Sequence, residues 1–340
     1  MMALIRTAIA KHLLPRNPTF RALSTSSPRP AHPIPLLPHH RIHLLFGANT
    51  DVGKSVVSTG IVRAAAAAST SSQQQHTSVN YIKPLQCGGS DESFVLRHHR
   101  DDDEKRTNDS NGKQTDFDIK CETLFRWETP ASPHLASRWE NMPVSDDEVI
   151  ASLRSSLKNV EDDSEPNQSD DMRSITIVES AGGVLSPSSS SPLNKSTAES
   201  HWGWSTQADL YAPLKIPVVF VGDGKLGGIS VTLASLESLW SRGYRIDAVV
   251  FIEGEVSGDE NDDSDGGGSI QFGKGNTEAL REYITMQQRK ESMLDGDSII
   301  CLPSLPPMPF PLDDWYENNQ DEFLKLHQLL CQRWRDNFVE

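Results

Sequence analysis

Residues Gly47 to Ser55 read GANTDVGKS. Taken from Ala48, the stretch satisfies the phosphate-loop pattern A/G-x-x-x-x-G-K-S/T; taken from Gly47, it is one residue too long. An apolar run, Ile42 to Phe46, precedes it and a helical pattern, Gly53 to Ala68, follows it. A loop wrapped before a helix turns backbone N–H groups and the positive end of the helix dipole toward an anion. The sequence therefore predicts nucleotide binding by Asp51, Val52, Gly53, Lys54, Ser55 and Val56. The alternative is a glycine turn beside an incidental surface lysine.

Two side chains of this loop have specific expected roles. Lys54 should reach the β- and γ-phosphates of ATP, and the Ser55 hydroxyl should ligate Mg²⁺. Dimeric switch ATPases of the partitioning type place a further lysine near the start of this loop. Asn49 and Thr50 stand there instead, which argues against that class.

Short apolar runs alternate with helical patterns along the chain. This order predicts an α/β fold of the P-loop NTPase type, a mostly parallel sheet with helices on both faces. Ligands in such sheets bind beyond the carboxyl ends of the strands. The expected strands are Ile42–Phe46, Val79–Leu85, Ile175–Glu179, Val218–Val221, Ala248–Ile252 and Ile299–Leu302, and the expected helices are Gly53–Ala68, Ser230–Trp240, Asn276–Gln288 and Glu322–Trp334.

The composition argues against several classes of protein. Over 340 residues, 47 acidic and 32 basic side chains give a net charge of −15, which argues against nonspecific nucleic-acid binding. No run of about 18 apolar residues occurs, so no transmembrane helix and no membrane partner are expected. The four cysteines are dispersed without a Cys-x-x-Cys pair, which disfavours a disulfide scaffold or a zinc ribbon.

The first 40 residues differ from the rest in charge. They carry Arg6, Lys11, Arg16, Arg21 and Arg29 and no acidic residue. Such a composition is typical of an organellar presequence, and its arginine content favours the mitochondrion over the plastid. We therefore expect a mitochondrial presequence and Pro-rich linker over residues 1–40 and one domain over residues 41–340. The alternative is an unstructured basic tail.

Four polar stretches interrupt the domain, at residues 100–118, 161–171, 186–191 and 256–269. They are rich in charged residues, serine or glycine and bury too little apolar surface to offset chain entropy. We expect all four to be disordered surface loops.

Five blocks occur in order along the chain: GANTDVGKS, YIKPLQCGG (Tyr81–Gly89), TPASPHLAS (Thr129–Ser137), VESAGG (Val178–Gly183) and VGDGKLGGIS (Val221–Ser230). Together they resemble dethiobiotin synthetase, and the presequence and insertions resemble the plant form, which is fused to a pyridoxal-phosphate aminotransferase. The resemblance implies ATP-dependent ring closure of 7,8-diaminopelargonate with CO₂ or bicarbonate, through a carbamate and a carbamic-phosphoric anhydride. It also implies a homodimer and coupling to such an aminotransferase.

The resemblance implies roles for individual residues. Lys83 matches the lysine between carbamate and phosphate, beside the catalytic Lys54. Thr50, Cys87, Gly228 and Ser230 match substrate contacts. The remaining nucleotide contacts would be Asp91, Glu179, Ser180, Ala181, Gly182, Glu253, Gly254, Pro303, Ser304 and Leu305.

Magnesium prefers oxygen ligands, with one or two carboxylates beside phosphates and water. Ser55, Asp91 and Glu179 supply that set. Glu179 ends an apolar strand, where a carboxylate is costly unless it is paired or metal-bound. The alternatives are a surface acid at Glu179 and a shift of the Asp91 role to the adjacent Glu92.

Two residues depart from the family pattern. Cys87 stands where serine or threonine is usual, and a thiol is the weaker hydrogen-bond donor. Glu253 stands where bacterial members often carry an asparagine that reads adenine, so base selectivity could be relaxed. Two rival functions stay open: another P-loop amide ligase, and an inactive nucleotide-binding remnant.

Overall fold

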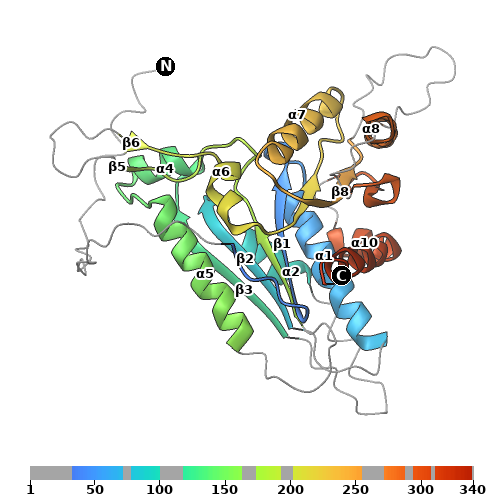
Figure 1. Cartoon of the computed structure of the whole chain (residues 1–340), viewed down its shortest axis with the longest axis horizontal. Helices are drawn as coiled ribbons and strands as arrows, with labels where there is room; N and C mark the ends of the chain where they lie inside the picture. The colour runs from blue at the N-terminus through green and yellow to red at the C-terminus, as the bar shows by residue number, and fades with distance from the viewer. Residues whose placement is uncertain are drawn as a thin grey trace. The chain divides into compact units, whose positions relative to one another are not determined.

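The computed structural model describes residues 33–71, 78–99, 118–162, 174–192, 202–254, 272–287, 294–307 and 311–338 (Figure 1). The expected presequence as far as residue 32 lies outside this part of the chain. So do the polar stretches at residues 100–117, 163–171 and 256–269. None of the described helices is long and apolar enough to cross a membrane.

Seven parallel strands form the central sheet, in the order β3-β2-β4-β1-β7-β8-β9. A short antiparallel pair, β5 (Ser191–Pro192) and β6 (Trp202–Gly203), lies apart from it. The α/β fold with a parallel sheet is thereby confirmed. The seven strands are β1 (His40–Gly47), β2 (Ser78–Cys87), β3 (Asp118–Trp127), β4 (Ser174–Glu179), β7 (Val218–Val221), β8 (Ile246–Ile252) and β9 (Ile299–Leu302).

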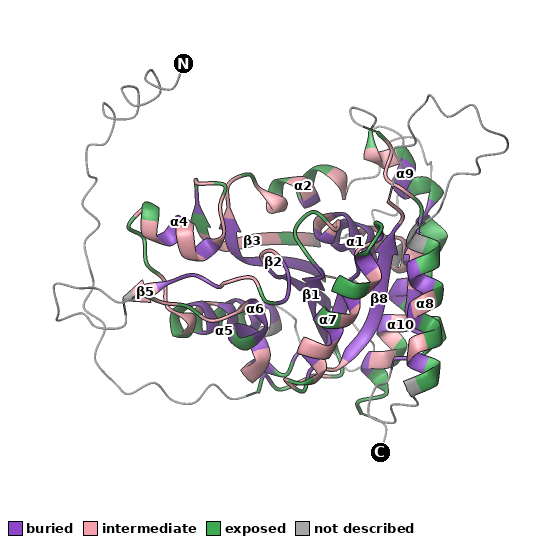
Figure 2. Cartoon of the chain, turned by 90° about the horizontal axis from the view of Figure 1, so that it is seen from above, coloured by how far each residue is buried: buried purple, intermediate pink, exposed green. Residues whose placement is uncertain are grey.

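Helices cover both faces of this sheet (Figure 2). Alternate residues of β1 show why: Leu44 and Phe46 belong to one buried cluster, and Leu45 to the other. The first cluster includes buried residues of α4 (Pro133–Trp139), α5 (Asp146–Asp162), α6 (Gln207–Tyr211), α7 (Gly228–Trp240) and α8 (Phe272–Gln287). The second includes residues of α1 (Lys54–Ser71), α2 (Asp91–His98), α9 (Leu312–Asn318) and α10 (Gln320–Arg335). Two 3₁₀ turns, η1 (Ala212–Leu214) and η2 (Gly296–Ser298), complete the chain order.

Helix α1 packs closely against α10. A Cβ at Gly60 would lie 2.0 Å from the ring of Phe323, so only glycine lets the two helices approach this far. Tyr316 donates a hydrogen bond from its hydroxyl to the carbonyl of Val56, at 3.1 Å. These contacts fix the position of α1, the helix that follows the phosphate loop.

The packed domain includes residues N-terminal to the expected boundary at residue 41. Ile34 is buried and its N–H donates to the carbonyl of Leu214, at 3.0 Å. The indole of Trp334 donates to the carbonyl of Leu37, at 3.0 Å. Residues 34–40 therefore belong to the domain in its folded form.

The expectation of a disordered loop at residues 186–191 is wrong. Ser188, Ser189 and Ser190 are all buried. Their hydroxyls donate to Asp146 at 2.9 Å, to the carbonyl of Val144 at 2.6 Å and to the carbonyl of His134 at 2.8 Å, in that order. Short hydroxyl side chains can be buried when each finds an acceptor, and composition alone did not reveal these acceptors.

Candidate active site

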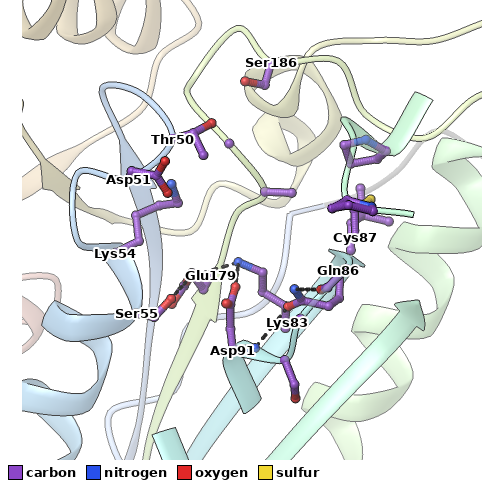
Figure 3. A pocket seen from close by; sticks show the side chains of 18 of the residues that line it. Thr50, Asp51, Lys54, Ser55, Lys83, Gln86, Cys87, Asp91, Glu179 and Ser186 are labelled. Carbon is purple, nitrogen blue, oxygen red and sulfur yellow. Dashed lines mark hydrogen bonds and ion pairs between the residues drawn. The ribbon is translucent and has the colours of Figure 1, made fainter. Parts of the chain in front are cut away.

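A cavity of about 800 Å³ opens beyond the carboxyl ends of β2 and β4, beside the phosphate loop (Figure 3). This is the edge of the sheet where ligands of α/β proteins bind. Four segments meet there: the phosphate loop, the turn from β2 into α2, the loop before α4, and the residues after β4. The lining residues are Thr50, Asp51, Gly53, Lys54, Ser55, Val56, Lys83, Leu85, Gln86, Cys87, Gly88, Gly89, Ser90, Asp91, Phe94, Pro130, Ala131, Ser132, Pro133, Glu179, Ala181, Gly182 and Ser186.

The phosphate loop has the tight backbone its pattern predicts. Asp51 and Gly53 both have positive φ, 59° and 92°. At Gly53 the positive φ would strain any other residue, and a Cβ would lie 2.4 Å from the Cδ1 of Ile252, which would have to move. The Lys54 ammonium turns back onto the loop and donates to the carbonyl of Asn49, at 3.1 Å. The loop is thus curled around its lysine at the N-terminus of α1.

Glu179 is fully buried at the end of β4, and three neighbours bind its carboxylate. Ser55 and Lys83 donate to Oε1, each at 2.9 Å, and Ser58 donates to Oε2 at 2.7 Å. A buried charge is tolerated when it is paired and hydrogen-bonded in this way. The alternative of a surface acid at this position is excluded.

Lys83 joins two carboxylates from different elements. Its ammonium lies 2.9 Å from Glu179 Oε1 and 2.6 Å from Oδ2 of Asp91, at the start of α2, and it also donates to the carbonyl of Ser180 at 3.2 Å. The Lys83 side chain is only 5% exposed, so it is not a solvent-exposed lysine. Asp91, rather than Glu92, faces this cluster: Glu92 accepts a hydrogen bond from Thr123 instead.

These contacts set the charge of the cluster. Burial alone would lower the pKa of Lys83, but Glu179 and Asp91 outweigh it and raise that pKa above its usual value. Burial would raise the pKa of Glu179, but Lys83 reverses the shift and holds it below its usual value. Lys54 lacks such a direct carboxylate contact, and burial lowers its pKa to about 8. The cluster is an ammonium between two carboxylates, with a second lysine beside it.

The segment after β4 approaches the phosphate loop through small residues. A Cβ at Gly183 would lie 3.0 Å from the carbonyl oxygen of Ala48, and Gly182 has a φ of 72°. Ser186 closes this turn by accepting a hydrogen bond from the Gly183 N–H, at 2.8 Å. Ala181 and Gly182 line the cavity, and Ser180 contributes its carbonyl to Lys83.

Cys87 lies at the end of β2 in the wall of the cavity. Burial, with a smaller contribution from Glu140, raises the pKa of its thiol to about 12. The neutral thiol can donate a weak hydrogen bond, and it lacks the thiolate character that makes a cysteine reactive. Thr50 lines the same cavity.

Nine expected site residues lie outside this lining, and Val52 and Ser180 are two of them. Gly228 and Ser230 are in the first turn of α7, whose N-cap is Gly227. Glu253 follows β8, where its N–H donates to the carbonyl of Leu302, at 3.0 Å; one of its carboxylate oxygens, Oε1, is buried and has no hydrogen-bond partner among the described residues. The others are Gly254, Pro303, Ser304 and Leu305, which follow β8 and β9.

Several residues that line the cavity or support its side chains were not identified from the sequence. Ser58 donates a hydrogen bond to the carboxylate of Glu179. Gln86 stabilises the turn into α2, because its Nε2 donates to the carbonyl of Gly88, at 2.8 Å. Residues 130–133 and Ser186 also line the cavity. The block TPASPHLAS was the available signal for residues 130–133. For Ser58 and Ser186 the sequence holds no signal that separates them from surface serines.

The oxygen ligands that Mg²⁺ prefers are gathered in one place. Asp91 and Glu179 already share one cation, the Lys83 ammonium, and the Ser55 hydroxyl lies 2.9 Å from Glu179. Two carboxylates and a hydroxyl beside a phosphate loop fit a magnesium–nucleotide complex. The cavity can therefore bind phosphates and stabilise negative charge with two lysines.

The comparisons with known proteins agree with this chemistry. A family model described as an AAA domain matches residues 42–287. The chain is similar to the mitochondrial bifunctional dethiobiotin synthetase/7,8-diamino-pelargonic acid aminotransferase of Arabidopsis thaliana, with 33% identity over 271 residues, 68% of this chain and 30% of that protein. It is also similar to the ATP-dependent dethiobiotin synthetase BioD of Phenylobacterium zucineum, with 27% identity over 209 residues, 61% of this chain and 74% of that protein. The resemblance carried by the five blocks is confirmed.

The chain spans 30% of the length of the Arabidopsis protein and 28% of its counterpart in Oryza sativa subsp. japonica, to which it is 31% identical. Among solved structures, the ParA protein of pNOB8 bound to nonspecific DNA is 11% identical, with a TM-score of 0.45 over 88% of this chain and all of that one. A likeness of that size carries no argument about function.

Proposed function

The chain belongs to the AAA domain family, and on that premise we propose that it is an ATP-dependent dethiobiotin synthetase, a ligase of biotin synthesis. The observation that carries the proposal is the cluster in one cavity of Lys54, Lys83, Asp91 and Glu179. The relatives named dethiobiotin synthetase support it, as does the order of the five sequence blocks.

In the proposed reaction, one amine of 7,8-diaminopelargonate adds to CO₂ and forms a carbamate. A carbamate oxygen attacks the γ-phosphate of ATP and ADP leaves. The second amine then attacks the carbonyl carbon of the mixed anhydride, inorganic phosphate leaves, and the ring closes. Negative charge accumulates in each step, so fixed cations are the main requirement of the site. Lys54 would neutralise the γ-phosphate, Lys83 would lie between carbamate and phosphate, and Thr50 and Cys87 would contact the diamine.

Ser55, Asp91 and Glu179 would hold Mg²⁺ with the nucleotide phosphates. When bound, the metal neutralises the triphosphate. Asp51–Val56 and Ser180–Gly182 would contact the phosphates through their backbone. Glu253, Gly254 and residues 303–305 would hold the base, where the unpaired Oε1 of Glu253 can accept a hydrogen bond from an exocyclic amine.

A homodimer is part of the proposal. Gly228 and Ser230 lie beside the exposed side chains Leu226 and Val231, which are 79% and 40% exposed. Apolar side chains exposed at one helix terminus fit a subunit contact, through which Gly228 and Ser230 would reach the substrate. Light scattering of the full chain tests this: a mass of one chain would contradict it.

The plant relatives carry the word mitochondrial in their names and fuse the synthetase to an aminotransferase. We therefore propose import into mitochondria, directed by the basic residues of the expected presequence (residues 1–40), whose last residues, 34–40, pack with the domain over residues 41–340. A pyridoxal-phosphate aminotransferase would supply the diamine. A fluorescent fusion of residues 1–40 that stayed in the cytosol would contradict the import proposal.

The proposed activity is tested by phosphate release from the full chain with Mg-ATP and bicarbonate, with and without 7,8-diaminopelargonate. Release should depend on the diamine and should be matched by dethiobiotin detected by mass spectrometry. ATP hydrolysis at the same rate with and without the diamine would instead favour another P-loop amide ligase. ATP binding without any hydrolysis would favour an inactive remnant.

Lys83→Ala separates catalysis from nucleotide binding. Lys83 does not belong to the phosphate loop, so without added metal the variant should bind a fluorescent ATP analogue nearly as well as the natural chain. It should nevertheless lose dethiobiotin formation by at least about 100-fold, because a lysine that stabilises developing charge is removed. Normal turnover would show that the role assigned to Lys83 is wrong.

A further inference from the structure

The Lys83 ammonium lies where two proposed metal ligands meet. It is 2.6 Å from Asp91 Oδ2 and 2.9 Å from Glu179 Oε1 (Figure 3). Asp91 begins a helix on one side of the cavity and Glu179 ends a strand on the other. Lys83 is therefore the cation that joins these two carboxylates in the described part of the chain.

A second cation cannot simply be added to this arrangement. Glu179 is fully buried, so its charge must be balanced by a direct neighbour. An ammonium and a divalent ion bound to the same two carboxylates would repel each other strongly at such short range. Lys54 does not enter this competition, because its ammonium donates to the carbonyl of Asn49.

We propose that Lys83 and Mg²⁺ are alternative occupants of the Asp91–Glu179 carboxylate pair. Lys83 holds the pair together in the metal-free protein, and it is displaced into the cavity when the metal binds with the nucleotide. The inference rests on the proposed function for the assignment of Asp91 and Glu179 to the metal. It adds an order of events: Lys83 becomes free to meet the carbamate and phosphate only after the metal has arrived.

The surrounding hydrogen bonds are consistent with an exchange at one side of Glu179. Ser58 donates to Oε2, the oxygen that Lys83 does not use, at 2.7 Å. This bond can persist in both states and hold the carboxylate in its orientation. Ser55 donates to Oε1, as Lys83 does, so its hydroxyl must also turn when the metal binds.

The experiment measures metal binding to the full chain without nucleotide or diamine. Mn²⁺, which is visible by electron paramagnetic resonance, is titrated into the natural chain and into Lys83→Met. Removing the competing ammonium should tighten Mn²⁺ binding on the order of 10-fold or more. Lys83→Gln, which keeps a hydrogen-bond donor but no charge, should behave in the same way if Lys83→Met folds poorly.

Two control variants separate direct competition from a general change in charge. Lys83→Arg keeps a cation beside the carboxylates, so its Mn²⁺ affinity should stay close to that of the natural chain. Lys54→Met removes an equal charge from a lysine in the same cavity that contacts a carbonyl instead. Its Mn²⁺ affinity should rise clearly less than that of Lys83→Met.

Thermal unfolding gives an independent measurement. Without metal, Lys83→Met should have a lower Tm, because two carboxylates then face each other unpaired. Mg²⁺ should raise that Tm more than it raises the Tm of the natural chain. Equal or weaker Mn²⁺ affinity in both Lys83→Met and Lys83→Gln, or a gain matched by Lys54→Met, would overturn the exchange. Neither measurement requires turnover, so a result that overturns the exchange can be told apart from a result that overturns the proposed reaction.

Discussion

Gln86 is a buried side chain at the candidate active site that connects both ends of a turn. Its Nε2 donates to the carbonyl of Gly88, at 2.8 Å, and its Oε1 accepts from the N–H of Asp91, at 3.4 Å. These bonds position Asp91 against Lys83. We expect Gln86→Met to lower kcat/KM for phosphate release by about 10- to 100-fold, because small displacements of reacting groups are costly. Stability should fall by only about 1 kcal/mol.

The control for this prediction is a glutamine far from the cavity. Gln328 is exposed on α10, so Gln328→Met should leave both kcat/KM and Tm nearly unchanged. If Gln86→Met showed normal kcat/KM with a reduced Tm, Gln86 would be a structural residue and not a positioning one.

Gly183 lies where the segment after β4 meets the phosphate loop. A methyl group there would be 3.0 Å from the carbonyl oxygen of Ala48 and 3.2 Å from the Cα of Asn49. Both neighbours are backbone, so the loop itself must move by a few tenths of an ångström. We expect Gly183→Ala to weaken ATP-analogue binding by about 10-fold, because the N–H groups of the loop lose their alignment. Isothermal titration measures this, and unchanged affinity would contradict it.

The sequence was sufficient to identify the charged residues of the site, but not the uncharged residues that hydrogen-bond to them. Lys54 follows the glycine of the phosphate-loop pattern, and Lys83 and Glu179 lie within or at the end of apolar strands. A charged residue at such a position is explained by an ion pair or a ligand contact. Ser58 is different: it is a serine within α1, and only the position of β4 behind it gives it a partner. Roles that depend on a neighbour far along the chain leave no local signal.

At the scale of elements, Gly275 offers a test of helix α8. It lies in the first turns of α8, its φ is not positive, and a Cβ there would meet nothing within 4 Å. Alanine restricts the unfolded chain and favours the helix, so Gly275→Ala should stabilise the protein by about 0.5–1 kcal/mol. Urea unfolding measures the change. A loss of stability would mean that α8 does not begin where the structure places it. The variant also serves as the control for Gly183→Ala, because the same substitution is made where the added methyl group meets no neighbour.

Helix α5 and strand β3 are among the elements that the sequence analysis missed, because their signals are weak or were not weighed. Helix α5 begins after Ser145, whose backbone and hydroxyl donate to Glu148 in a capping box, and Val149, Leu153 and Leu157 follow at helical spacing. That signal was present in the sequence. Strand β3 pairs only with β2 and is mostly half-buried, so its apolar alternation is incomplete.

At the scale of the molecule, alternation of strands and helices predicted a parallel sheet but not the order of its strands. The site depends on that order. β4 lies between β1 and β2, and this places Glu179 between the phosphate loop and Lys83. Pairing of strands nearly 100 residues apart in sequence is decided by the packing of both faces together, which no local pattern encodes.

The whole fold should also be sensitive to acid, through histidines remote from the site. Burial, with a smaller contribution from His39, lowers the pKa of His40 from 6.5 to about 4, and burial beside Arg41 lowers that of His327 to about 3. In the unfolded chain both would titrate near 6.5. Between pH 6.5 and pH 4 the unfolded state therefore binds more protons, and stability falls as the pH falls.

For His40, the free energy of unfolding should fall by about 3 kcal/mol between pH 6.5 and pH 4, at about 1.4 kcal/mol per pKa unit. His40→Gln removes the titration, and its amide can still donate to Thr176 Oγ1, which lies 2.8 Å from the imidazole in the natural chain. Urea unfolding from pH 7 to pH 4.5 should therefore give a shallower decline for His40→Gln than for the natural chain. His39→Gln, at an exposed neighbour, should change the decline little. Parallel curves for the natural chain and His40→Gln would mean that His40 is protonated in the folded protein, and acid sensitivity would then have to arise from His327 and the buried His43–Asp247 pair.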